Sequence, residues 1–170
     1  DLKDADLLNY LDLYDFSVRS PAKFWTAVWD FGGIRGTGDR DPVLVEGARM
    51  QDARWFPDVR LNFAQNLLRY HDDRTALIFR GESGVAKELS YAQLHDEVAK
   101  LAAALARAGV GVGDRVAGFM PNVPETVVAM LAATSLGAIW SSCSPDFGLS
   151  GVVDRFGQIQ PKVLFTCEAY

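Results

Sequence analysis

The side chains that most often act as nucleophiles or metal ligands are rare in this chain of 170 residues, which contains two cysteines and two histidines. Cys143 and Cys167 lie in or beside apolar, strand-like runs, where a free thiol packs as a small hydrophobe. A cysteine nucleophile needs an activating base nearby, and His71 and His95 stand in polar segments that we expect to be exposed. No spacing among these four residues matches a zinc-binding pattern. We therefore predict no catalytic residue and no metal site in this chain.

Two glycine-rich stretches are the candidates for a loop that binds phosphate. Residues 36–38 read GTG, but no clear strand precedes them and no Lys-Ser or Lys-Thr pair follows them. Residues 109–113 read GVGVG, which has too few spacer residues for the G-x-G-x-x-G pattern of dinucleotide-binding loops. We interpret both stretches as solvent-exposed loops.

The composition and charge are those of a globular domain. Hydrophobic residues make up 49% of the chain and charged residues 23%, and these values argue against disorder. The net charge of −5 offers no basic surface, so we predict no nucleic-acid partner. The acidic opening DLKDADLLNY lacks the apolar core of a signal peptide, and the longest apolar run, 127–133, is too short to span a bilayer. We predict no membrane association and a cytoplasmic location.

Helix signals and large aromatic residues dominate the start of the chain. Apolar residues at three- and four-residue spacing predict a short helix over 4–16. Ser20 and Pro21 are typical of an N-cap and a first helical residue, and they predict a second helix. Trp25 and Trp29 lie on one face of that helix, where we expect the rings to be structural rather than to bind a ligand.

Shorter elements follow, and then one long helix. The predicted elements are an extended segment over 54–58, a helix over 61–68, and two strands over 75–79 and 88–90 joined by a turn at 81–84. Ser90 and Gln93 have the spacing of a capping box and mark the start of the long helix, which we expect to end at Gly109.

The last third of the chain alternates between strand and helix. Strands are predicted over 115–120, 138–142 and 163–166, with helices over 122–136 and 149–156 between them. Crossover connections of helix length imply parallel strands with right-handed connections. We therefore predict an α/β fold in which an N-terminal helical segment is followed by the first part of a doubly wound, mostly parallel sheet with flanking helices.

Three segments together resemble the N-terminal part of the adenylate-forming acyl-CoA synthetases. They are YLDLYDFSVRSPAKFWTAVWDF at 10–31, RWFPDVRLNFAQNLL at 54–68 and GDRVAGFMPNVPETVVAMLAATSLGAIWSSCSPDFG at 113–148. The resemblance implies an N-terminal helical region over 1–68 and the first, incomplete part of the AMP-binding domain over 69–170.

The resemblance also implies a two-step reaction. An acid attacks the α-phosphate of ATP to give an acyl-adenylate and pyrophosphate, and the thiol of CoA then displaces AMP. The implied cofactors of the parent enzyme are ATP, Mg²⁺ and CoA, and its other partner is a small acid. The family's phosphate loop and its adenine-binding motifs have no match here. We therefore expect an inactive fragment that binds none of these cofactors and whose natural partner is the remainder of its own chain.

Within this family, the run SCSPDFG at 142–148 followed by DRFGQIQPKVLF at 154–165 favours acetoacetate as the acid. Two alternatives stay open at this point. One is a fragment of a synthetase that acts on acetate or propionate, and the other is a non-catalytic, flavodoxin-like binding module.

The resemblance points to one candidate site. The turn after the second parallel strand approaches CoA in related synthetases, which implies that Ser144, Pro145, Asp146 and Phe147 line a channel for CoA or the acyl group. The alternative is a plain turn in which Asp146 caps the next helix. The last predicted strand adds a further expectation, because an exposed sheet edge is a template for pairing. We expect the isolated chain to self-associate through this edge, unless the first helices fold over it.

Overall fold

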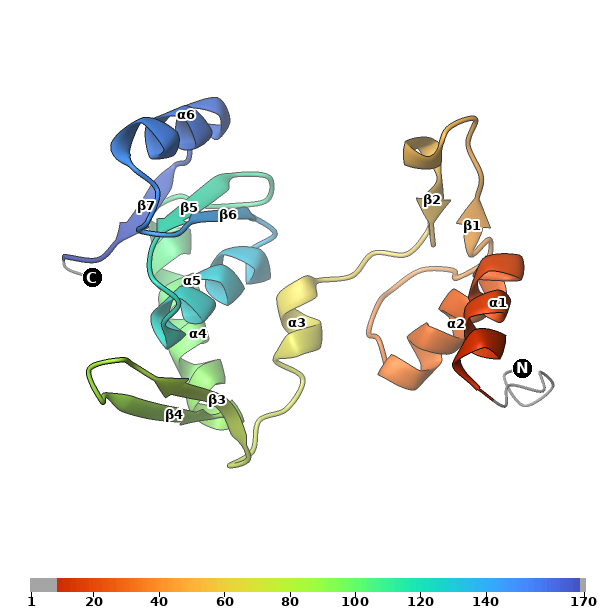
Figure 1. Cartoon of the computed structure of the whole chain (residues 1–170), viewed down its shortest axis with the longest axis horizontal. Helices are drawn as coiled ribbons and strands as arrows, with labels where there is room; N and C mark the ends of the chain where they lie inside the picture. Colours follow the sequence, from red (N-terminus) through yellow and green to blue (C-terminus); the bar gives the residue numbers. More distant parts are fainter. Residues whose placement is uncertain (1–8, 169–170) are drawn as a thin grey trace. The chain divides into compact units, whose positions relative to one another are not determined.

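The computed structural model describes residues 9–168 and divides into two compact units, Asp1–Leu61 and Asn62–Tyr170 (Figure 1). We call them the first and the second unit and describe each by itself. The division at residue 68 that the family resemblance implies stays a prediction. Within residues 9–168, no helix combines the length and the apolar character that crossing a membrane requires.

The first unit opens with two helices, α1 (Tyr10–Arg19) and α2 (Pro21–Gly32). Asn9 and Asp12 form a capping box at the start of α1. The sequence predicts that this helix starts at residue 4, which lies outside the described residues. The helix continues past the predicted end at residue 16. It ends at Arg19, with Ser20 as its C-cap directly before Pro21. Ser20 and Pro21 open α2 as predicted, and Gly33 ends it in the left-handed conformation.

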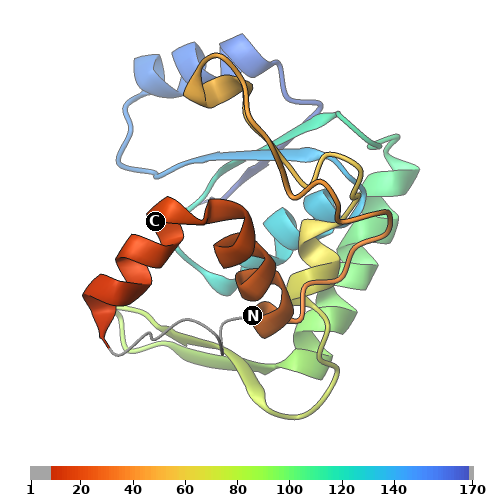
Figure 2. The ribbon, with the colours of Figure 1, turned by 90° about the vertical axis from the view of Figure 1, so that its right-hand side faces the viewer.

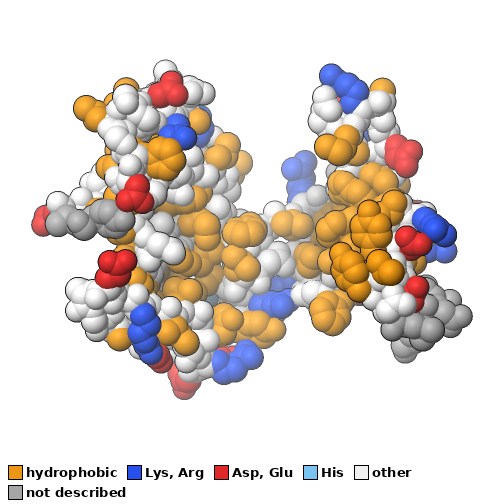
Figure 3. All heavy atoms as spheres, in the orientation of Figure 1, with side chains coloured by type: hydrophobic (Ala, Val, Ile, Leu, Met, Phe, Trp, Pro, Cys, Tyr) orange, Lys and Arg blue, Asp and Glu red, His pale blue; other side chains and the backbone are white. Residues whose placement is uncertain are grey.

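The rest of the first unit is a short antiparallel pair, β1 (Leu44–Val45) and β2 (Arg54–Trp55), with a 3₁₀ turn, η2 (Met50–Asp52), between them. Trp29 is buried, and its ring centre lies 4.9 Å from that of Phe56. Trp25 is 45% exposed and packs edge-on against Trp55. Figure 3 shows hydrophobic side chains gathered over α1 and α2, and the exposed ones on α1 include Tyr10, Leu11, Tyr14 and Val18.

The second unit begins with α3 (Phe63–Leu67), the hairpin of β3 (Thr75–Arg80) and β4 (Ala86–Ser90), and α4 (Tyr91–Arg107). These elements confirm the helix, hairpin and long helix that the sequence predicts. Ser90 and Gln93 form the predicted capping box, in which each side chain binds the other residue's backbone N–H. Gly109 has a φ of 81° directly after α4, which only glycine adopts without strain.

A three-stranded parallel sheet forms the core of the second unit. Its elements are β5 (Arg115–Phe119), α5 (Pro124–Ser135), β6 (Ile139–Cys143), α6 (Leu149–Ile159) and β7 (Val163–Thr166). The strand order is β6-β5-β7, with both pairings parallel. This arrangement confirms the predicted α/β fold with its parallel, doubly wound sheet.

The helices cover both faces of this sheet. The connection from β5 to β6 and the connection from β6 back across β5 to β7 run in opposite directions, so right-handed crossovers place α5 and α6 on opposite faces. Figures 1 and 2 both show α6 on one side, with α4 and α5 on the other. Successive residues of β5 follow this division, because Val116 belongs to the apolar cluster of α4 and α5, while Ala117 packs with Phe156 of α6.

Gly118 of β5 leaves room for the indole ring of Trp140 on the face of α5. A Cβ atom at this position would lie 2.7 Å from Cη2 of Trp140, closer than packed atoms approach. The ring of Trp140 lies 6.2 Å from that of Phe165, measured between centres, so β6 and β7 place their large rings on either side of the glycine. A glycine in a strand interior often marks such a close approach.

We predict that Gly118→Ala lowers the free energy of unfolding by about 1–3 kcal/mol, the usual cost of overpacking a core. Gly157→Ala in α6 is the matched control, because no atom lies near its added methyl group, and alanine is favoured over glycine inside helices. Urea unfolding followed by circular dichroism measures both variants. Wild-type stability in Gly118→Ala would show that the indole moves aside without cost.

A second prediction concerns the tryptophans of α2. Trp29→Ala is expected to cost about 3–5 kcal/mol, because the removed ring is buried. Trp25→Ala is the control and is expected to cost clearly less, because nearly half of that side chain is already in solvent. The same urea experiment applies, and a loss below about 1 kcal/mol for Trp29→Ala would contradict the structural role.

Candidate functional site

The carboxyl ends of the three parallel strands define the candidate site. In doubly wound sheets, ligands bind in the crevice beyond these ends. Strands β5, β6 and β7 end at one edge of the sheet, and residues 120–123, 144–148 and 167–168 follow them. These segments contain no lysine or arginine. They therefore offer backbone, apolar, hydroxyl, amide and carboxylate groups to a ligand, but no cation that could neutralise a polyphosphate.

The four residues implied by the family resemblance form the turn after β6. The hydroxyl of Ser144 donates a hydrogen bond to Oδ2 of Asp146 at 2.7 Å, and the N–H of Phe147 donates to the carbonyl of Ser144 at 3.1 Å. The turn is largely exposed, with Pro145 half-buried. Helix α6 begins at Leu149, and the extended backbone of Gly148 before it forms the N-cap without a side-chain bond. The alternative in which Asp146 is the N-cap of α6 is therefore wrong, because Gly148 occupies that position.

A cation lies directly beside this turn. The guanidinium of Arg155, on the second turn of α6, lies 4.0 Å from the ring centre of Phe147, which is 40% exposed. Stacking of this kind holds the ring and the guanidinium together. The pair presents an aromatic face and a positive charge to solvent, a combination suited to binding rather than to proton transfer.

Strand order adds a second location that the residue pattern does not reveal. Because the chain returns across β5 on its way to β7, the topological switch point lies between these two strands. The loop after β5 is braced there, since the hydroxyl of Thr126 donates to the carbonyl of Pro121 at 2.8 Å and the N–H of Val123 donates to the same oxygen at 2.9 Å. The predicted start of a helix at residue 122 located this loop, but it carries no information about strand order.

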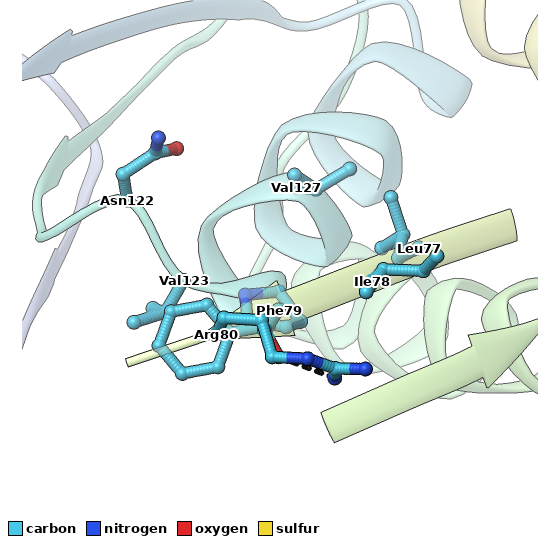
Figure 4. A pocket seen from close by; sticks show the side chains of 8 residues that line it. Leu77, Ile78, Phe79, Arg80, Asn122, Val123 and Val127 are labelled. Atoms are coloured by element: carbon cyan, nitrogen blue, oxygen red, sulfur yellow. Dashed lines mark hydrogen bonds between the residues drawn. The ribbon is translucent and has the colours of Figure 1, made fainter. Parts of the chain in front are cut away.

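A cavity of about 350 Å³ adjoins this loop, within the size range of small-molecule sites. Its walls are the C-terminal part of β3 and the start of α5 (Figure 4). The lining residues are Leu77, Ile78, Phe79, Arg80, Asn122, Val123, Pro124 and Val127. Arg80 is held in place by bonds to the carbonyl of Phe79 at 3.2 Å and to the carboxylate of Glu88 at 2.9 Å. The cavity therefore combines apolar walls with an amide and a guanidinium that is already paired.

One ion pair next to the cavity links β4 to the start of α5. Nζ of Lys87 on β4 lies 2.7 Å from Oε1 of Glu125 in the first turn of α5. The hydrogen bond from Lys87 lowers the pKa of Glu125, and the same bond raises the pKa of Lys87. Both side chains are more than one-third exposed, so the pair contributes at most about 1 kcal/mol.

The pH dependence of this pair can be tested. A lowered carboxyl pKa stabilises the fold above the ordinary glutamate value of about 4.3, and the contribution is lost as the pH falls through the lower folded value. Glu125→Gln is therefore expected to lose up to about 1 kcal/mol relative to wild type at pH 7 and less than that at pH 3, in urea unfolding. Glu82→Gln in the exposed hairpin turn is the control. Equal losses at both pH values would contradict the ion-pair account.

Comparisons with known proteins give this geometry a context. The family model "Acetyl-coenzyme A synthetase N-terminus" matches residues 10–67, and the model "AMP-binding enzyme" matches residues 63–170. The acetoacetyl-coenzyme A synthetase of Rhizobium meliloti is 52% identical over 95% of this chain and 25% of its own length. The malonamoyl-CoA synthetase of Penicillium aethiopicum is 39% identical over 96% of this chain and 24% of its own.

A solved structure extends the likeness to three dimensions. The acetoacetyl-CoA synthetase from Streptomyces lividans superposes with a TM-score of 0.87 at 41% identity, over 93% of this chain and 25% of that one. The chain thus spans about a quarter of the length of the relatives it matches. Because the AMP-binding model covers more than half of the residues, the chain belongs to the AMP-binding enzyme family.

Proposed function

We propose that this chain is the N-terminal part of an ATP-dependent acid–CoA ligase that converts acetoacetate, ATP and CoA to acetoacetyl-CoA, AMP and pyrophosphate. The observation that carries the proposal is the likeness to acetoacetyl-CoA synthetases along nearly the whole chain, in sequence and in structure. In the proposed division, residues 1–68 form the N-terminal region and residues 69–170 the first part of the AMP-binding domain.

The residues of this chain suit positioning better than phosphate chemistry. Adenylate formation requires cations that spread the charge of the reacting phosphate. The segments at the carboxyl edge provide none, so they do not fit ATP and its Mg²⁺ by themselves. We therefore expect the 170-residue chain alone to be inactive.

We also propose that Ser144, Pro145, Asp146 and Phe147 line the channel for CoA or the acyl group. Three observations support this role: the turn follows a parallel strand at the carboxyl edge, it is exposed, and its aromatic ring is held by Arg155. We also propose a cytoplasmic location. We further propose that the isolated chain self-associates through the edge of β7, where the side chain of Leu164 is half-exposed.

The relatives favour one alternative acid over the others. Malonamate and acetoacetate both carry a carbonyl group at the β-carbon relative to the carboxylate. A malonamoyl-CoA synthetase is among the similar proteins. Acetate and propionate lack this carbonyl. A non-catalytic, flavodoxin-like module is disfavoured, because the proteins of similar sequence and the matching structure are synthetases.

The test is a pyrophosphate-release assay on the full-length protein with acetoacetate, malonamate, acetate and propionate at equal concentrations. We expect kcat/KM for acetoacetate to exceed that for acetate by about tenfold or more, since a site built to bond a carbonyl rejects acids that lack it. The 170-residue chain alone serves as the negative control. A tenfold preference for acetate would reject acetoacetate as the substrate, and a preference for malonamate would select the alternative.

A further inference from the structure

The second unit brings together three side chains that the spacing along the sequence keeps apart. His71 precedes β3, while His95 and Asp96 lie near the start of α4. Two ring nitrogens and one carboxylate oxygen, one atom from each residue, lie within 4.8 Å of one another. His71 and His95 are the two histidines of the chain, so all of its imidazole groups meet at this one place.

The two imidazole rings have a spacing close to that of metal ligands. Their centres lie 4.5 Å apart with an angle of 41° between the planes. With metal–nitrogen bonds of about 2.0–2.1 Å, two imidazoles on one tetrahedral ion have ring centres roughly 5 Å apart. Oδ1 of Asp96 lies 3.9 Å from Nδ1 of His95. His71 and Asp96 are exposed, so side-chain rotation can close the remaining gap without moving the core.

The backbone that carries His71 is fixed against α4. The N–H groups of Tyr91 and Ala92 donate to the carbonyls of Arg74 and Asp72, each at 3.0 Å. The rings of Tyr70 and Tyr91 pack edge-to-face, with 5.4 Å between their centres. A ligand held on such a segment loses little conformational freedom when it binds an ion, which favours binding.

The positive charge near the three side chains is partly balanced by carboxylates. Arg74 forms an ion pair with Asp72 at 2.8 Å, and its guanidinium lies over the ring of Tyr70. The guanidinium of Arg69 also lies over the ring of Tyr70, 5.1 Å from its centre. Asp96 adds a negative charge directly beside the imidazoles.

We propose that His71, His95 and Asp96 bind a late first-row divalent cation such as Zn²⁺, with water completing the coordination. Imidazole nitrogen suits zinc, copper and nickel, whereas magnesium and calcium prefer sites made of oxygen. The site is therefore separate in its chemistry from the Mg²⁺ that accompanies ATP in the proposed reaction.

Calorimetric titration of the 170-residue chain with ZnCl₂ tests the proposal. Cys167→Ser is used as the background, because a partly exposed thiol is a competing zinc ligand. We expect one Zn²⁺ per chain, and a loss of affinity of about tenfold or more in both His71→Gln and His95→Gln. Electron paramagnetic resonance with Cu²⁺ in place of Zn²⁺ is expected to show two coordinating nitrogens in the background protein and one in each variant.

A pair of charge variants separates coordination from general attraction. Asp96→Asn is expected to weaken Zn²⁺ binding, whereas Asp73→Asn removes the same charge from the nearby exposed segment and is expected to bind as the background protein does. Circular dichroism verifies that each variant is folded. If His95→Gln is unfolded, the affinity of His71→Gln for Zn²⁺ decides the test. Unchanged affinity in His71→Gln, or equal losses in the two aspartate variants, would overturn the proposal.

Discussion

Strand β5 has to be covered on both faces, and the arrangement of the second unit depends on this requirement. Val116 and Ala117 point to opposite sides of the sheet, yet both are fully buried. A parallel sheet is stable in water only when helices shield both faces. Helices α4 and α5 shield one face and α6 the other, so the chain has to cross the sheet in both directions. Those crossings decide which segments meet at the carboxyl edge.

The edge that results is well shaped and weakly charged. The braced loop after β5, the exposed turn after β6 and the cavity beside β3 offer apolar walls with a few polar groups. Two cations described there, Arg80 and Arg155, are already engaged with a carboxylate and with an aromatic ring, respectively. In the ligase that we propose, such a surface suits the organic parts of the substrates, and the phosphate groups need side chains from elsewhere.

Local features of the sequence predicted the local structure well. The capping box of Ser90 and Gln93 and the turn at Gly109 depend on neighbouring residues, so their residue types suffice to locate them. Crossovers of helix length likewise sufficed to predict parallel strands. Strand order did not follow, because no local pattern states that β7 pairs with β5 rather than with β6.

The candidate site shows the same limit. The turn at 144–147 was located by family resemblance. The hydrogen bond that the carboxylate of Asp146 accepts from the hydroxyl of Ser144 could be seen only in the structure. The switch point next to the loop after β5 required the strand order. The meeting of His71 and His95 required the packing of the segment before β3 against α4, which spacing along the chain conceals.

The late arrival of β7 has a consequence for synthesis of the protein on the ribosome. Lys162, directly before β7, binds Asp114, directly before β5, across 48 residues of sequence. At a translation rate of about 5–20 residues per second, β5 is made roughly 2–10 seconds before the strand that covers its second edge. During that interval the hairpin and α4 can already fold, because their contacts are local. The nascent chain therefore exposes an unpaired strand edge for seconds, the kind of surface that chaperones protect.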